Sequence, residues 1–119
     1  MTRFMLSQGL QNFVVWRKAV LLVKISYGLI GKFPDYENYS LAQQVRRACI
    51  SIPANIAEGR YRVGKDFQYH MSVARGSCAE LQNHFVVAKE LSYIGAQDLD
   101  DFLKTSGEVM KMLNAILKK

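Results

Sequence analysis

Apolar side chains recur at alternating steps of three and four along four separate segments of the 119-residue chain. This spacing marks one face of an α-helix, and no segment shows the alternation typical of a β-strand. We predict helices at roughly 10–33, 40–62, 65–94 and 98–118. The connections are short, so consecutive helices should run antiparallel. The chain is therefore predicted to be all-α, one domain spanning 1–119, folded as an up-down-up-down four-helix bundle.

The first and last predicted helices each carry two neighbouring apolar stripes. In the first helix, one stripe is Phe13, Trp16, Val20, Val23, Tyr27 and Ile30, and beside it lies a second stripe of Val15, Ala19, Leu22, Leu29 and Phe33. In the last helix, one side carries Leu99, Leu103, Met110, Leu113 and Leu117, and the adjacent side carries Phe102, Val109 and Ile116. This surface is broader than a two-layer packing needs. We expect the surplus on the first helix, together with the last helix, to mediate self-association.

The second predicted helix contains a proline, Pro53, at its middle. A proline there removes one backbone hydrogen bond and clashes with the preceding turn, at a cost of about 3 kcal/mol. We therefore predict that this helix is kinked at Pro53. Ser40 is predicted to cap its start, and Gly59 or Gly64 to end it. Gly76, inside the third helix, is predicted to permit close approach of another helix.

Four polar residues interrupt the apolar stripes of the second and third helices, namely Asn55, Glu58, Arg75 and Glu80. Asn55 and Glu58 are three residues apart, so they share one helix face, and the other two could lie opposite them. A half-buried polar cluster of these four residues, in which each finds a partner, would offset the cost of placing them there. The alternative is that Glu58 and Glu80 form a carboxylate pair for acid–base or metal chemistry.

Neither a metal site nor a catalytic site is indicated by the remaining chemistry-bearing residues. Cys49 and Cys78 fall inside apolar helical patterns, so we expect two reduced, buried thiols, with metal or redox chemistry as the alternative. His70 and His84 are fourteen residues apart, about 21 Å along a helix, too far to share one ion. No hydrolase triad signature, phosphate-binding glycine loop or zinc motif occurs. We predict no enzyme activity, no metal and no cofactor.

The chain shows neither a secretory signal nor a membrane span. Its apolar run at 19–30 is interrupted by Lys24 and is too short to cross a bilayer. We therefore expect a cytoplasmic protein with no membrane partner.

The formal net charge of +6 is unevenly distributed. Residues 1–34 hold five basic side chains and no acid, residues 40–75 hold six against two, and residues 76–119 have a net charge of −1. Such an asymmetry fits a domain that meets a polyanion, and it equally fits a solvated basic surface that keeps a protein soluble.

Five basic residues are the candidate phosphate contacts: Arg46, Arg47, Arg60, Arg62 and Lys65. The last three cluster where the second and third helices meet, beside Tyr61 and Tyr69. Arginine beside tyrosine at a turn can clamp phosphates and stack on unpaired bases. The alternative is that Arg46 or Arg47 pairs with Asp35, Glu37 or a neighbouring subunit.

Six short motifs occur in order along the chain: V-W-R-K-A (15–19), K-F-P (32–34), Q-V-R-R-A (44–48), S-I-P-A-N-I-A-E-G (51–59), K-D-F (65–67) and A-R-G-S-C-A-E-L (74–81). With them the chain, over roughly 13–117, resembles the four-helix-bundle proteins encoded by intervening sequences within bacterial 23S ribosomal RNA genes. Gly64 departs from the serine that often precedes the third helix in that family. The resemblance implies a ring, typically a homopentamer, with a positively charged face. It also implies kinship with the accessory bundle proteins of diversity-generating retroelements, which bind a reverse transcriptase and nucleic acid.

These observations together favour non-catalytic nucleic-acid binding, RNA more than DNA, by an oligomeric bundle through its basic face. The rival hypothesis is a protein–protein adaptor whose basic face docks an acidic partner or a reverse transcriptase. A third hypothesis is a bundle with no selected ligand.

Overall fold

The structure, a computed structural model that describes residues 13–118, consists of four α-helices and one short 3-10 turn. The elements are α2 (Val14–Ile30), η1 (Asp35–Glu37), α3 (Leu41–Arg60), α4 (Gly64–Glu90) and α5 (Ala96–Lys118). The predicted all-α four-helix bundle is confirmed. Predicted helix residues 10–12 lie outside the described residues, and every other helix end is within four residues of its prediction. Among residues 13–118, no helix is long and apolar enough to span a membrane.

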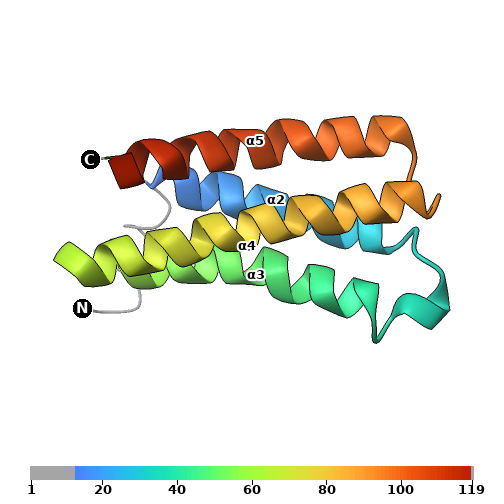
Figure 1. The fold of residues 1–119 in the computed structure, drawn as a ribbon, viewed down its shortest axis with the longest axis horizontal. Coiled ribbons are helices and arrows are strands. Elements are labelled where there is room, and N and C mark those ends of the chain that lie inside the picture. The colour runs from blue at the N-terminus through green and yellow to red at the C-terminus, as the bar shows by residue number, and fades with distance from the viewer. Residues whose placement is uncertain (1–12, 119) are drawn as a thin grey trace.

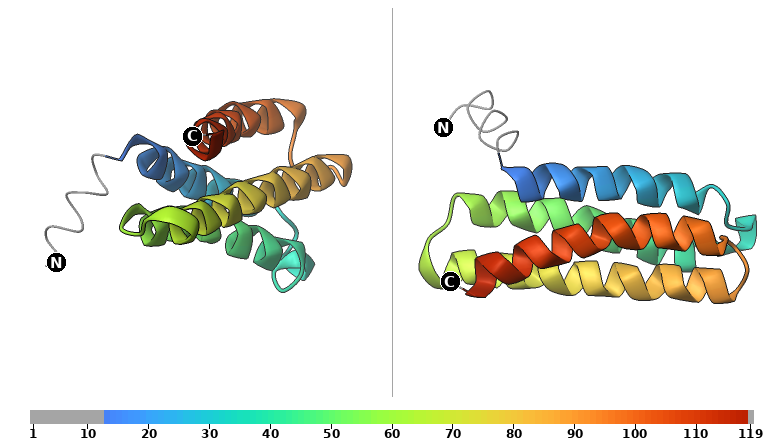
Figure 2. Two further views of the ribbon diagram at one scale, coloured as in Figure 1. Left: turned by 60° about the vertical axis from the view of Figure 1, so that its left-hand side comes forward. Right: turned by 90° about the horizontal axis from the view of Figure 1, so that it is seen from above.

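Consecutive helices run antiparallel, and α5 returns to pack beside α2 (Figures 1 and 2). Each helix packs mainly against two others, so the four form a square rather than a layer. Two ends result. The α3–α4 end holds the turn between those helices, the start of α2 and the end of α5, and the α4–α5 end holds the opposite turns.

The apolar rows of α3 and α4 face the core, and Leu41 and Phe67 at their starts are half-buried. Val45, Ala48, Ile52 and Ile56 of α3 are buried, as are Met71, Ala74, Cys78, Leu81, Phe85 and Ala88 of α4. Both thiols are free and buried, which matches the prediction for Cys49 and Cys78. Burial raises the pKa of each thiol to about 11.

The two predicted stripes on each of α2 and α5 are buried to different extents. On α2 the second stripe is buried, while Tyr27 is exposed and Trp16 is half-buried. On α5 the buried residues come from both stripes: Phe102 and Val109 of one and Leu113 of the other are fully buried, whereas Leu99 and Leu103 are half-buried.

A serine continues each of these two buried rows, and it broke the apolar pattern in the sequence. Ser26 in α2 donates its hydroxyl hydrogen to the Leu22 carbonyl at 2.8 Å. Ser106 in α5 accepts a hydrogen bond from the Gln82 side-chain amide at 3.0 Å. Because each hydroxyl has a partner, its burial costs little.

The helix ends use other groups than the predicted caps. The Ser40 side chain makes no capping hydrogen bond, so that prediction was wrong; the Leu41 amide donates instead to the Glu37 carboxylate at 3.3 Å. Before α5, the Gly95 amide donates to the Asp98 carboxylate at 3.0 Å, which is half of a capping box. Asp98 therefore stabilises this N-terminus.

The glycines also differ from prediction. Gly59 does not end α3: it is buried, and a Cβ there would lie 2.8 Å from the Cβ of His70 in α4. Gly76 is exposed, and among residues 13–118 a Cβ added to it would meet nothing within 4 Å, so the predicted close approach does not occur between the described helices. Gly64 has φ of +60°, a left-handed conformation that glycine adopts without strain. The close approach of α3 and α4 is therefore at Gly59.

Pro53 lies inside α3, and the helix continues on both sides of it. The kink at Pro53 stays a prediction.

Candidate nucleic-acid interface

The five predicted phosphate contacts fall into two groups. Arg46 and Arg47 lie near the start of α3, whereas Arg60, Arg62 and Lys65 surround the α3–α4 turn. Fourteen residues separate Arg46 from Arg60, about 21 Å along the helix axis. The structure therefore brings the last three together and leaves the first two apart from them.

Arg46 belongs to the scaffold. Its guanidinium donates to the backbone carbonyl of Asn38 at 2.6 Å and to the side-chain oxygen of Asn38 at 3.4 Å. These bonds tie the segment before α3 to the helix, and the predicted alternative partners Asp35 and Glu37 are not used. Arg47 is exposed and lines a hollow of about 110 Å³ with Glu80.

The α3–α4 turn is held in shape by its own basic residues. The Arg60 guanidinium carbon lies 4.8 Å from the Phe13 ring centroid and 5.9 Å from that of Tyr61, in cation–π contact. Arg62 forms an ion pair with Glu58, one helical turn earlier. Lys65 is exposed in the first turn of α4. The turn thus presents cations on a pre-ordered backbone.

Charge is distributed unequally between the two halves of the described bundle. When each helix is divided at its middle, the half with the α3–α4 turn carries eight basic and three acidic side chains. The basic ones are Arg17, Lys18, Arg60, Arg62, Lys65, Arg75, Lys111 and Lys118, and the acidic ones are Glu58, Asp66 and Glu108. The other half carries six basic and seven acidic side chains. The positive surface is therefore one end of the bundle rather than a face along its length.

The predicted four-residue polar cluster does not form. Asn55 contacts His70, whose Nδ1 lies 3.1 Å from the Asn55 side-chain oxygen, and Glu58 pairs with Arg62. Arg75 donates to the Asn114 side chain at 3.1 Å, and Glu80 lies 3.3 Å from His84. The sequence placed these residues on the correct helices but could not supply their partners.

The alternative carboxylate pair is also wrong. Glu80 lies beside Arg47, and eleven residues of α3 separate Arg47 from Glu58, about 16 Å. Among residues 13–118, no group of three histidine, cysteine, aspartate or glutamate side chains could hold a metal ion.

A polar row between α3 and α4 replaces the predicted cluster. The hydroxyl oxygens of Ser51 and Ser77 are 2.9 Å apart, and the Asn55 amide donates to the Ser51 carbonyl at 2.9 Å. His70 extends the row through Asn55. The sequence carried a signal for it, because His70 and Ser77 are seven residues apart on one face of α4.

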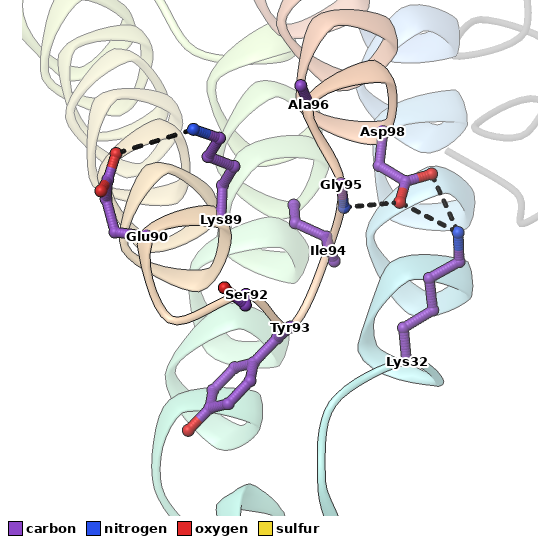
Figure 3. A pocket seen from close by; sticks show the side chains of 9 residues that line it. All are labelled: Lys32, Lys89, Glu90, Ser92, Tyr93, Ile94, Gly95, Ala96 and Asp98. Carbon is purple, nitrogen blue, oxygen red and sulfur yellow. Dashed lines mark hydrogen bonds and ion pairs between the residues drawn. The ribbon is translucent and has the colours of Figure 1, made fainter.

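A hollow of about 590 Å³ lies at the α4–α5 end, far from the basic turn (Figure 3). Its charged groups are paired, Lys32 with Asp98 and Lys89 with Glu90, and the Gly95 amide donates to Asp98. The Tyr93 hydroxyl points away from these pairs and donates to Glu37 at 2.6 Å. These contacts close the turns at this end and leave little polar chemistry for a ligand.

An apolar groove of about 400 Å³ lies between the start of α2 and the end of α5. Its lining residues are Phe13, Val14, Val15, Met112, Ala115 and Ile116. On α2 next to it, Val14 and Leu21 are 46% and 42% exposed, one heptad apart. This is the pair of helices from which self-association was predicted.

The fold and the basic end define the class: a small antiparallel four-helix bundle with a positively charged end. The family model of the 23S rRNA-intervening sequence protein matches residues 11–115, and the chain belongs to this family. None of the curated proteins matches the chain.

A solved structure has the same fold. It is the crystal structure of a protein with unknown function from the S23 ribosomal protein family, from Bacteroides thetaiotaomicron. The TM-score is 0.81 at 21% sequence identity, over 88% of this chain and 99% of that one. At this identity the likeness supports the fold alone.

Proposed function

We propose that the protein is a non-catalytic nucleic-acid-binding bundle that favours RNA and that binds through its α3–α4 end. The observation that carries this proposal is the excess of eight basic over three acidic side chains in that half. A phosphate backbone releases counterions wherever such side chains neutralise it, which favours binding at low salt. Arg60, Arg62 and Lys65 are the proposed phosphate contacts, because they share the turn.

The proposal includes self-association through the exposed apolar surface of α2 and the groove beside α5. Each copy adds one basic end, so several weak phosphate contacts combine into a useful affinity. The family resemblance favours five copies. Light scattering should then give five times the 13.5 kDa chain mass, and Leu21→Glu should lower that mass because it places a charge in the contact. A monomer mass for the unmodified protein would contradict the assembly.

Fluorescence anisotropy with a labelled 20-nucleotide RNA at 50 and 200 mM salt tests the binding site. The double variant Arg62→Gln with Lys65→Gln should weaken binding and flatten the salt dependence, because each lost contact lowers the log–log slope by about 0.7 to 0.9. It removes the exposed Arg62–Glu58 ion pair but leaves Arg60 on the Phe13 ring.

The matched control is Arg47→Gln with Lys89→Gln, which removes two cations from the other half. The control should bind as the unmodified protein does. Absence of binding at low salt, or equal losses in both double variants, would overturn the assignment of the α3–α4 end.

An adaptor is the second candidate function, and a row on α4 favours it. Uncharged, exposed residues recur there at steps of three and four: Tyr69, Ser72, Gly76, Ala79, Asn83 and Val86. Such a row would accept a helix of a partner protein. A partner, such as a reverse transcriptase, that stays bound after nuclease treatment and is released by Ala79→Glu would support this function over RNA binding.

A further inference from the structure

An exposed aromatic ring stands beside the cations of the α3–α4 end. Tyr69 in α4 is 63% exposed, and its ring contacts the ring of His70 at 5.2 Å between centroids with an interplanar angle of 76°. Within the described part of the chain, its hydroxyl has no hydrogen-bond partner. A tyrosine that neither fills the core nor connects two elements contributes little to the stability of the fold, so Tyr69 is available to contact a ligand.

Lys65 and Tyr69 are four residues apart in α4, and both are exposed. Residues at this spacing are neighbours on one helix face, about 6 Å apart along the axis. An ammonium group and an aromatic ring are therefore presented together. This is the combination with which proteins hold single strands: the cation binds a phosphate and the ring stacks on a base.

The neighbouring turn is fixed before any ligand arrives. Arg60 is stacked over Phe13, Arg62 is paired with Glu58, and Gly64 takes a left-handed conformation that lets the chain enter α4. A pre-ordered site loses less conformational entropy on binding. Val63, at the tip of the turn, is 86% exposed and adds apolar surface beside the cations.

The shape and the chemistry both favour unpaired nucleotides over a duplex. In an A-form duplex the bases are stacked on one another, so an exposed ring finds no free base face, and the protein must rely on phosphates and 2′-hydroxyls. The cations of the turn form a compact end rather than a long track, because Arg46 and Arg47 lie about 20 Å away in the other half of the bundle.

We propose that the α3–α4 end binds unpaired nucleotides, with Tyr69 stacked on one base and Lys65 on an adjacent phosphate. This inference rests on the proposed function and specifies its ligand. The ring of Tyr61, which lies under Arg60, holds the turn rather than the base.

The test compares an unstructured 12-nucleotide RNA with a duplex of the same length by anisotropy at 50 mM salt. Tyr69→Ala should weaken binding of the single strand about 5- to 100-fold, since stacking on one base is lost, and should leave duplex binding unchanged. Tyr69→Phe keeps the ring and should bind as the unmodified protein does. The matched control is Tyr39→Ala, because Tyr39 is 86% exposed in the connection before α3, at the opposite end.

The outcomes separate the inference from the proposed function. Salt-dependent binding of both RNAs that Tyr69→Ala does not change, or changes equally, overturns the stacking role while leaving the basic end as a binding site. A loss in Tyr39→Ala as large as that in Tyr69→Ala also overturns it. Absence of binding to either RNA removes the proposed function and this inference with it.

Discussion

Replacing Gly59 by alanine should force α3 and α4 apart at the basic end. A Cβ at this position would lie 2.8 Å from the Cβ of His70, 3.0 Å from the Met71 terminal methyl and 3.6 Å from the Phe67 carbonyl oxygen. The Met71 methyl can swing away because it ends a flexible side chain. The Cβ of His70 is fixed to the α4 backbone, so the helix itself must shift.

Two effects of opposite sign set the size of the change. Overpacking of a well-packed site costs about 1–3 kcal/mol, and a backbone shift belongs in the upper part of that range. Replacing glycine by alanine inside a helix raises the free energy of unfolding by about 1 kcal/mol, because alanine has the higher helix propensity. We therefore expect Gly59→Ala to lower the free energy of unfolding by about 1–2 kcal/mol.

Gly76→Ala is the matched control, because Gly76 is also inside a helix but has none of the described residues within 4 Å of its Cβ position. It should raise the free energy of unfolding by about 0.5–1 kcal/mol, the helix-propensity gain alone. Urea unfolding followed by circular dichroism measures both variants against the unmodified protein. If Gly59→Ala is as stabilising as Gly76→Ala, α3 and α4 do not meet closely at Gly59 and the packing argument fails.

Two further predictions concern ionisable groups. The Gly95 amide and then Lys32 hold the pKa of Asp98 below its ordinary value of 3.8, so the carboxylate stabilises the fold above that pH and this contribution is lost as the pH falls further. Asp98→Asn should therefore destabilise the protein at pH 7 and have little effect near pH 2, which urea unfolding at the two pH values measures. Burial raises the pKa of Cys49 and Cys78 from 9.0 to about 11, so the folded protein should lose stability as the pH rises between these values. At pH 8 the two thiols should react with a thiol reagent only as fast as the protein unfolds, and thiols that react at once in the native protein would contradict their burial.

The helices could be predicted because their apolar rows are long and uninterrupted on α3 and α4. The core-facing side of each helix is identified by large apolar residues one turn apart, such as Ile52 and Ile56 on α3 and Leu81 and Phe85 on α4. On α2 and α5 two stripes compete, and the buried one contains Ser26 or Ser106. A hydroxyl bonded to its own helix or to Gln82 is compatible with the core, but periodicity alone counts it as polar.

Only part of the geometry of the candidate site could be predicted, because sequence spacing is informative only within one element. The Glu58–Arg62 pair and the Lys65–Tyr69 neighbours follow from a separation of four residues. The contact of Arg60 with Phe13 joins residues far apart in the chain, so it depends on the packing of α2 against α3. The sequence alone could not separate Arg46 from the proposed phosphate contacts, since its partner Asn38 lies in an irregular connection.

The motif at residues 51–59 determines where the basic turn lies, although its side chains are not the proposed contacts. Three residues of the motif stand at steps of four on α3 and contact α4. Ser51 is hydrogen-bonded to Ser77, Asn55 contacts the His70 ring, and Gly59 lies against the Cβ of His70. A shift of α4 by one turn along α3 would break both polar contacts and place a larger side chain against the small gap at Gly59. Because the register is fixed over these nine residues, the next residues, Arg60 to Lys65, turn in one place and carry their cations at one end of the bundle.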